Sequence, residues 1–232
     1  MEIRVNKYLS ESGFCSRREA DRLIEQKRVK INGLFAEMGS KVTESDVITV
    51  DNQEVINKKD FVYLAFNKPI GITSTTDTSI KGNIVDYINY EKRIFHIGRL
   101  DKDSEGLILM TNDGDIVNQV LRSENNHEKE YVVTVDKPIT DDFIHQMSRG
   151  VPILNTVTKP CMVKKISDRT FNIILTEGLN RQIRRMSDYF GYQVLSLKRI
   201  RIMHIHLDVP VGKYRPLTSK ELAILFKSIK KS

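Results

Sequence analysis

The chain has 232 residues, of which 40% are hydrophobic and 29% charged, and its formal net charge is +7 at pH 7. These proportions are ordinary for a soluble globular protein. No apolar run approaches the roughly 20 residues that a membrane-spanning helix needs, and the first residues lack the apolar segment of a secretion signal. The two cysteines, Cys15 and Cys161, are far apart and show no metal-binding spacing. We therefore expect a cytoplasmic protein without membrane association, in a reducing compartment.

The positive charge is concentrated near the end of the sequence. From Thr176 onward there are twelve Lys and Arg residues against four Asp and Glu, a net charge of +8, so the rest of the chain sums to −1. Such a concentration favours a polyanionic partner. A charged surface that is only solvated remains the alternative, since charge alone does not separate the two.

The first sixty residues predict two short helices followed by a hairpin. Residues 4–12 suit a helix that Gly13 ends, and Ser16-Arg17-Arg18-Glu19 forms a capping box before a second helix. Residues 29–33 predict a strand that enters an Asn-Gly turn. Further short strands are expected around residues 41–42 and 47–50. The residues expected to face inward from the two helices are Val5, Tyr8, Leu9, Ala20, Leu23 and Ile24.

This order of helix, turn, helix and hairpin resembles the S4 RNA-binding domain, a small α/β module. The resemblance implies that basic residues near the second helix contact RNA phosphates, which position the fold without reading sequence. The candidates are Arg4, Arg17, Arg18, Lys27, Arg28 and Lys30. S4 domains usually carry Gly where this chain has Lys27. If the backbone there is left-handed, the lysine costs roughly 1 kcal/mol.

A polar run, Val55–Asp60, suits a linker, and we place a domain boundary near residue 60. The predicted domains are residues 1–60 and 61–232. After the boundary, Phe61–Phe66 alternates aromatic and aliphatic residues and predicts a strand. A loop, Asn67-Lys68-Pro69-Ile70-Gly71, is expected to follow.

The stretch from Ile97 to Gly114 holds the main candidate for chemistry. Leu107–Met110 is an unbroken apolar run that predicts a strand buried on both faces. Just before it, Gly98-Arg99-Leu100-Asp101 predicts a turn, so Asp101 would lie on a loop with a rigid support. Two other interpretations apply to the acidic residues of this loop. They are either solvated turn residues or half of a calcium loop, but the latter needs Glu where Asn112 stands.

The next segments predict a helix, a strand, a helix and a hairpin. An amphipathic helix is expected after Gly114, and Lys129–Val135 alternates so that Tyr131, Val133 and Val135 share one face. His127-Glu128-Lys129-Glu130-Tyr131 lacks the second histidine of the zinc motif H-E-x-x-H, so no metal site is expected. A short helix over residues 140–150 and a hairpin over residues 159–176 follow.

The basic segment predicts a helix from Arg181 to Phe190, ended by Gly191. Its periodicity places Arg181, Arg184 and Arg185 together on one side, opposite an apolar face. Residues 194–207 predict a β-rich stretch. A capping box, Thr218–Glu221, predicts the start of a closing helix whose inner face is Leu222, Leu225, Phe226 and Ile229.

Five motifs together resemble the pseudouridine synthases of the RsuA/RluB/RluE/RluF group. They are I-G-R-L-D-K-D-S-E-G-L-I-L-M-T-N-D-G, N-K-P-I-G, K-E-Y, N-R-Q-I-R-R-M and the pattern V-x-x-L-x-R-x-R-I that begins at Val194. Within the group, Asn83–Asp86, Asp136–Thr140 and Val151–Leu154 are most similar to the RluF type. The resemblance implies an α+β fold: an S4 domain followed by a catalytic domain with a mainly antiparallel mixed sheet flanked by helices.

The same resemblance implies an isomerase that converts uridine to pseudouridine in a 23S ribosomal RNA stem-loop, by base flipping and without a cofactor. It implies that Asp101 is the nucleophile or base, that Tyr131 stacks on the uracil and that Arg184 pairs with Asp101. Arg99 is expected to hold the gap that the flipped base leaves. The remaining residues expected to line the site or contact phosphates are Lys68, Arg181, Arg185 and Leu197.

The chain is expected to act as a monomer. Two alternatives stay open: an RluB-type synthase that acts on a neighbouring uridine, and a non-catalytic ribosome-associated RNA-binding protein.

Overall fold

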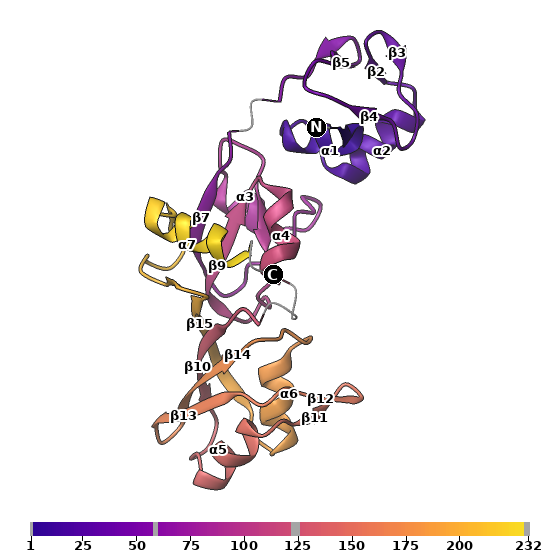
Figure 1. The fold of residues 1–232 in the computed structure, drawn as a ribbon. Helices are drawn as coiled ribbons and strands as arrows, with labels where there is room; N and C mark the ends of the chain where they lie inside the picture. The colour runs from indigo at the N-terminus through magenta and orange to yellow at the C-terminus, as the bar shows by residue number, and fades with distance from the viewer. Residues whose placement is uncertain (1, 58–59, 122–125, 230–232) are drawn as a thin grey trace. The chain divides into compact units, whose positions relative to one another are not determined.

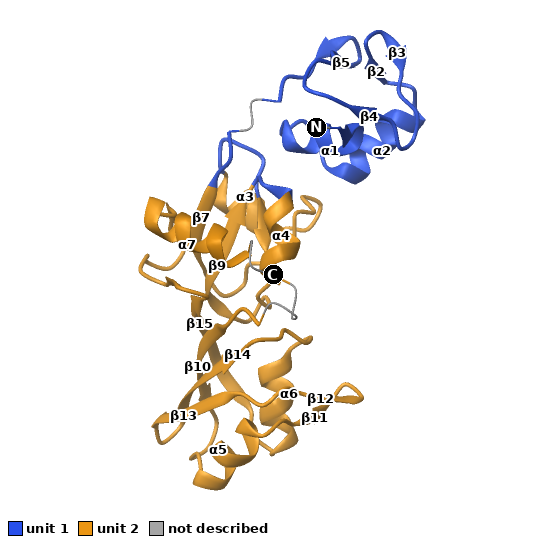
Figure 2. Ribbon diagram, in the orientation of Figure 1, with its two compact units in different colours: residues 1–62, 90–94, 112–114 blue, residues 63–89, 95–111, 115–232 orange. Residues whose placement is uncertain are grey.

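The computed structural model describes residues 2–57, 60–121 and 126–229. The chain forms two compact units, which Figure 2 distinguishes by colour. Unit 1 comprises residues 1–62, 90–94 and 112–114, and unit 2 comprises residues 63–89, 95–111 and 115–232. Lys58 and Lys59, in the middle of the expected linker, lie outside the described residues.

Unit 1 contains the two predicted helices, α1 (Val5–Glu11) and α2 (Arg17–Glu25). Ser16 caps α2, because its hydroxyl accepts a hydrogen bond from the amide of Glu19 at 3.1 Å. The strands β1 (Ile3–Arg4) and β4 (Lys41–Val42) pair, and a second sheet has the order β3 (Leu34–Phe35), β2 (Val29–Ile31), β5 (Ile48–Val50) and β6 (Gln53–Glu54). The inward faces predicted for both helices are confirmed, although Tyr8 is only partly buried.

Several residues of unit 1 adopt left-handed backbone conformations, among them the Asn-Gly turn and Lys27 that the sequence singles out. Asn32 and Gly33 have φ angles of 50° and 85°, as a tight hairpin turn between β2 and β3 requires. Lys27, at the end of α2, has a φ angle of 54°. The lysine therefore occupies a conformation that costs an ordinary side chain roughly 1 kcal/mol and that glycine adopts freely.

Unit 2 is built on a twisted sheet of nine strands within the described residues. Its path runs β13 (Met162–Ser167), β14 (Thr170–Leu175), β10 (Lys129–Val135), β15 (Val194–Ile202), β9 (Glu105–Thr111), β7 (Tyr63–Lys68) and β17 (Tyr214–Pro216). In addition, β16 (Ile205–His206) pairs with β15 and β8 (Phe95–Ile97) pairs with β9. Among these described pairings β9 with β15 is parallel, and the others are antiparallel.

The helices of unit 2 gather at its two ends, as Figure 1 shows. At one end are α3 (Ile84–Ile88), α4 (Gly114–Leu121) and α7 (Ser219–Ile229); at the other are α5 (Asp141–Ser148) and α6 (Gln182–Tyr189), near the small β11–β12 hairpin (Pro152–Ile153 and Thr156–Val157). Each end has an apolar core of its own. Leu107–Met110 of β9 is almost fully buried, as its apolar run predicts. None of the helices in the described ranges is long and apolar enough to cross a membrane.

Capping at the start of α7 follows the predicted reciprocal pattern. The amide and hydroxyl of Thr218 donate to the Glu221 carboxylate at 2.7 and 3.0 Å, and the Glu221 amide donates back to the Thr218 hydroxyl at 3.2 Å. Asn67 and Lys68, in contrast, do not belong to the expected loop. They are the last residues of β7 and pair with Leu107 and Gly106, because the antiparallel ladder between β7 and the buried strand β9 continues to the end of β7.

Candidate active site

A pocket of about 920 Å³ lies in unit 2, where the ends of β9, β10 and β15 meet the segment that precedes α6. It brings together residues that are far apart in the sequence. Of the predicted site residues, the lining includes Arg99, Asp101, Tyr131, Arg181, Arg184 and Leu197. Lys68 and Arg185 are not part of it.

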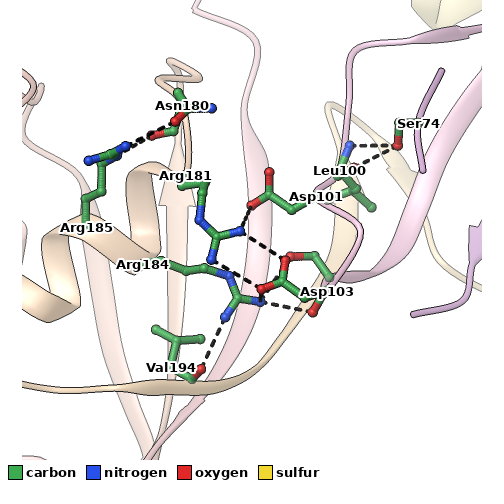
Figure 3. Close-up of polar contacts among 10 residues, drawn as sticks. Ser74, Leu100, Asp101, Asp103, Asn180, Arg181, Arg184, Arg185 and Val194 are labelled. Carbon is green, nitrogen blue, oxygen red and sulfur yellow. Dashed lines mark hydrogen bonds and ion pairs between the residues drawn. The ribbon is translucent and has the colours of Figure 1, made fainter. Parts of the chain in front are cut away.

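The loop that carries Asp101 is held from both sides. Ser74 accepts a hydrogen bond from the Leu100 amide at 3.2 Å and donates to the Leu100 carbonyl at 2.8 Å (Figure 3). After Asp101, the amide of Ser104 donates to the Asp101 carbonyl at 3.1 Å. The side chain of Asp101 keeps 35% of its surface exposed. A carboxylate is thus fixed at the mouth of a buried strand and open to the pocket.

Gly106 makes the parallel contact between β9 and β15 possible. Its φ angle is 118°, and a Cβ atom added there would lie 2.3 Å from the Arg199 carbonyl oxygen. Only glycine fits so close an approach of two backbones. The close contact anchors the start of β9, five residues after Asp101, against the strand that carries Leu197.

Arg181 is the cation that contacts Asp101 (Figure 3). It precedes α6 as the N-cap residue, with a left-handed φ angle of 50°, so it lies outside the helix that was predicted to contain it. Its Nη1 atom is 3.5 Å from Asp101 Oδ2, and its two terminal nitrogens donate to the Asp103 carboxylate at 3.1 and 3.2 Å. Arg181 therefore joins the two carboxylates of one loop.

Arg184 contacts Asp103, and the predicted pairing of Arg184 with Asp101 is wrong in this structure. Its Nη2 atom lies 3.3 Å from Asp103 Oδ2 and donates to the Asp103 carbonyl at 3.0 Å, while Nη1 donates to the Val194 carbonyl at 3.2 Å. The reason is geometric: Arg184 is one turn into α6, level with Asp103, and the left-handed residue before the helix turns Arg181 toward Asp101 instead.

The electrostatics of Asp103 reflect these two arginines. Partial burial raises the pKa of its carboxyl, but the hydrogen bond from Arg181 and the charges of Arg184 and Arg181 lower it by more. The pKa of Asp103 is therefore held below its usual range, and the carboxylate is charged at neutral pH.

Arg185 does not join the other two arginines, so the predicted common face is wrong for this residue. Its side chain turns back to Asn180, with Nε donating to the Asn180 carbonyl at 3.1 Å and Nη2 to the side-chain oxygen at 3.3 Å (Figure 3).

Tyr131 and Leu197 form part of the pocket wall from neighbouring strands. In the β10–β15 ladder Val133 is paired with Leu197 and Tyr131 with Arg199, so all four side chains belong to one face of the sheet. Tyr131 and Leu197 are buried in the apolar core at the end of unit 2 that carries α5 and α6. The strand alternation predicted from the sequence is confirmed.

Arg199 is a site residue that the sequence reasoning missed as a candidate. It is 3% exposed, its Nε donates to the Leu107 carbonyl at 2.7 Å, and its guanidinium carbon lies 6.0 Å from the centre of the Tyr131 ring. Its Nη2 atom is buried without a hydrogen-bond partner in the described part of the chain. The signal in the sequence was weak, because Arg199 becomes a neighbour of Tyr131 only through strand pairing.

Lys129 also lines the pocket and was not singled out. Burial and the charge of Arg199 lower the pKa of its amine to about 8, and its Nζ donates to the His127 carbonyl at 3.3 Å. Extending the alternation of Tyr131, Val133 and Val135 by one step toward the N-terminus would have found it, since Lys129 is on the same face.

Arg99 and Lys68 have different positions. Arg99 is exposed at the pocket, and its backbone carbonyl accepts a hydrogen bond from Arg199 at 3.4 Å. Lys68 is fully buried, and its amine donates to the carbonyls of Pro69 and Ile72 at 2.9 and 2.8 Å. Burial lowers the pKa of Lys68 to about 8. Because this amine supports the turn after β7, the expectation that Lys68 lines the site or contacts phosphates is not met.

The basic residues predicted to bind RNA in unit 1 are mostly at its surface. Arg28 forms a two-point pair with Asp51, at 2.9 and 2.5 Å, and Lys30 donates to Asn52 at 2.9 Å. The exposed members of the set are Arg4, Arg17, Arg18, Lys27 and Arg28. In the described residues no group of three or more His, Cys, Asp or Glu side chains is placed to hold a metal ion.

Two family models match the chain. Residues 3–48 match the S4 domain, and residues 62–189 match the RNA pseudouridylate synthase family. The structure is also similar to a solved structure described as a pseudouridylate synthase, with a TM-score of 0.71 and 29% sequence identity over 96% of this chain and 99% of the other.

Similar proteins with curated names agree with these matches. The dual-specificity RNA pseudouridine synthase RluF of Escherichia coli (strain K12) is 57% identical over 99% of this chain and 80% of the relative. The ribosomal large subunit pseudouridine synthase B of Bacillus subtilis (strain 168) is 35% identical over 94% of this chain and 93% of the relative. The predicted fold and activity are confirmed: the chain belongs to the RNA pseudouridine synthases of the RluF type, with an N-terminal S4 domain.

Proposed function

We propose that this protein converts a specific uridine of large-subunit (23S) ribosomal RNA to pseudouridine, with Asp101 as nucleophile or base. One observation carries the proposal: the carboxylate of Asp101 is held at the mouth of β9 in a pocket that also contains Tyr131 and Leu197. The 57% identity to the RluF proteins, against 35% to the B-type synthase, supports the RluF type.

The reaction breaks the bond from N1 of uracil to C1′ of the ribose and joins C1′ to C5. The proton lost from C5 is balanced by one gained at N1, so no oxidant, reductant or water is consumed. In our proposal Asp101 attacks or abstracts a proton, with the Arg181 guanidinium in contact with its carboxylate at 3.5 Å. Tyr131 stacks on the uracil, and Leu197 packs beside it.

A uridine within a stem must leave the helix before it reaches this pocket, at a cost of a few kcal/mol. We assign Arg99, exposed at the pocket, to the gap that the base leaves. Residues 1–60 are proposed as the RNA-binding domain and residues 61–232 as the catalytic domain. In the first, the exposed Arg17 and Arg18 at the start of α2 are suited to phosphate contacts, which position RNA without reading sequence.

The test follows tritium release from unmodified large-subunit ribosomal RNA that carries uridine tritiated at C5. Wild-type protein should release tritium, and Asp101→Asn should not, although it should still bind the RNA. Release by the variant would remove Asp101 from its proposed role. Binding without release by either protein would favour a non-catalytic RNA-binding protein. Sequencing of the product would identify the uridine, and modification of a neighbouring position would indicate the RluB type.

The name of the Escherichia coli relatives states dual specificity, and we propose a second RNA substrate for this chain as well. Pseudouridine mapping of total RNA from cells that lack the enzyme, before and after incubation with it, would report both substrates. We also propose a monomer in the cytoplasm. One chain supplies the pocket residues named above, and both cysteines are free thiols. Sedimentation of the protein with and without RNA would test the monomer.

A further inference from the structure

The arginine cluster beside the pocket is organised around Asp103 more than around Asp101. Asp103 accepts two hydrogen bonds from Arg181, at 3.1 and 3.2 Å, and Arg184 Nη2 lies 3.3 Å from the same carboxylate. Asp101 has a single contact to Arg181 at 3.5 Å. Two guanidinium groups and two carboxylates thus form a group without net charge at the place where an RNA chain must bind (Figure 3).

The two arginines differ in how firmly they are held. The side chain of Arg184 is 13% exposed; its Nη1 donates to the Val194 carbonyl, and its Nη2 also donates to the Asp103 carbonyl and the Ser104 hydroxyl. Arg181 is 41% exposed, Asp103 is 49% exposed, and both partners of the Arg181 guanidinium are carboxylates. Of the two arginines, Arg181 is therefore the one that solvent or another anion can reach.

A phosphodiester is the natural competitor for this position. It carries one negative charge on two oxygens, which accept the two parallel N–H groups of a guanidinium as a carboxylate does. The bidentate Arg181–Asp103 pair has this geometry. We propose that Asp103 takes the place of an RNA phosphate in the free enzyme, and that a phosphodiester of the bound substrate displaces it from Arg181.

This inference rests on the proposed binding of RNA at the pocket, but it does not depend on which uridine is modified. Its consequence is that RNA must compete with Asp103 for Arg181. Replacing Asp103 by asparagine removes the competing charge. The exposed ion pair that is lost is a weak one, so the affinity for RNA should rise by about two- to five-fold. Because one more cation is then available to phosphate, the slope of log affinity against log salt should steepen by about 0.7 to 0.9.

The experiment measures binding of unmodified, transcribed large-subunit ribosomal RNA over a series of salt concentrations. Wild-type protein is compared with Asp103→Asn, with Asp103→Glu, and with Asp168→Asn, which removes one exposed negative charge from the turn between β13 and β14. Asp103→Asn should bind more tightly and with a steeper slope. Asp103→Glu and Asp168→Asn should match the wild type. Melting of each variant checks that it is folded at the assay temperature.

A double variant tests whether the effect passes through Arg181. In an Arg181→Ala background, the further change of Asp103 to asparagine should leave the salt slope unaltered, because the cation in dispute is absent. If Asp103→Asn binds RNA as weakly as Arg181→Ala, Asp103 positions Arg181 for RNA, and the proposal is overturned. Phosphate contacts form with any bound RNA chain, so these slopes remain readable even if product mapping rejects the proposed ribosomal target.

Discussion

Arg181 and Asp101 are in contact, with 3.5 Å between Nη1 and Oδ2, although Arg181 lies just outside helix α6. The family resemblance implies Arg184 as the partner, and the structure directs Arg184 to Asp103 instead. The difference arises from one left-handed residue. Arg181 is therefore the arginine expected to affect turnover, and Arg184 is the one expected to hold the Asp101 loop in place.

We predict that Arg181→Ala lowers the turnover of saturating RNA on the order of 10²-fold, because the charge that stabilises Asp101 is lost. Arg185→Ala is the matched control, since the Arg185 guanidinium is engaged with Asn180. It should change turnover by no more than about two-fold. Single-turnover rates of both variants check this, and equal losses would argue against a special role for Arg181.

Arg184→Ala should instead destabilise the protein. It removes hydrogen bonds to the Val194 and Asp103 carbonyls from a largely buried side chain. We expect unfolding to become easier by about 1 to 3 kcal/mol, with a loss of turnover because the Asp101 loop shifts. Denaturant unfolding measures the first effect. An unchanged unfolding curve with turnover abolished would restore Arg184 as the direct partner of Asp101, the proposed catalytic carboxylate.

Lys129→Met should raise stability at pH 7. Below pH 8 the amine is protonated in the folded and the unfolded protein alike, and the folded state bears the cost of a partly buried cation next to Arg199. Between pH 8 and 10.5 only the unfolded chain keeps the proton, so wild-type stability rises with pH in this window. Removing the amine should gain about 1 to 3 kcal/mol at pH 7.

The advantage of Lys129→Met should therefore shrink as the pH rises from 7 toward 10. Melting temperatures of both proteins at several pH values test this. Lys129→Arg keeps a cation and should show no such gain. If the difference between Met and wild type is constant across the window, its origin is packing and not the charge of the lysine.

Lys27→Gly should stabilise unit 1 by roughly 1 kcal/mol, because glycine adopts the φ angle of 54° without a steric cost. Lys27→Ala keeps the Cβ atom and removes the charge, so it should not stabilise. Thermal unfolding separates the two variants. Comparing their RNA affinities isolates the contribution of the lysine charge, and a gain in stability with alanine would contradict the backbone explanation.

Gly106→Ala should damage both folding and the site. The added Cβ would lie 2.3 Å from the Arg199 carbonyl oxygen and 2.6 Å from its amide nitrogen, at a φ angle of 118°. We expect a loss of about 2 kcal/mol or more, together with slower turnover. Gly114→Ala is the control, since a Cβ at Gly114 meets no atom within 4 Å. Urea unfolding of the pair is the measurement.

Much of this protein follows from short segments of its sequence. The apolar run Leu107–Met110, the alternation in Lys129–Val135 and the capping box at Thr218 all predict elements that the structure contains. Each of these signals is local: the partners of a capping box are three residues apart, and the alternation of a strand repeats every two. The motif around Asp101 likewise indicated the family, and it places Asp101 on a loop before a buried strand, as the structure does.

Only the tertiary structure decided how the charged groups pair. Arg181 reaches Asp103 across 78 residues, Arg184 reaches the Asp103 carbonyl across 81, and Arg199 is paired with Tyr131 from another strand. Lys68 appears in the sequence as a loop cation, but the ladder of β7 and β9 buries its amine among backbone carbonyls. The energy of an ion pair depends on distance and burial. For residues so far apart in the chain, both are fixed only when strands and loops pack.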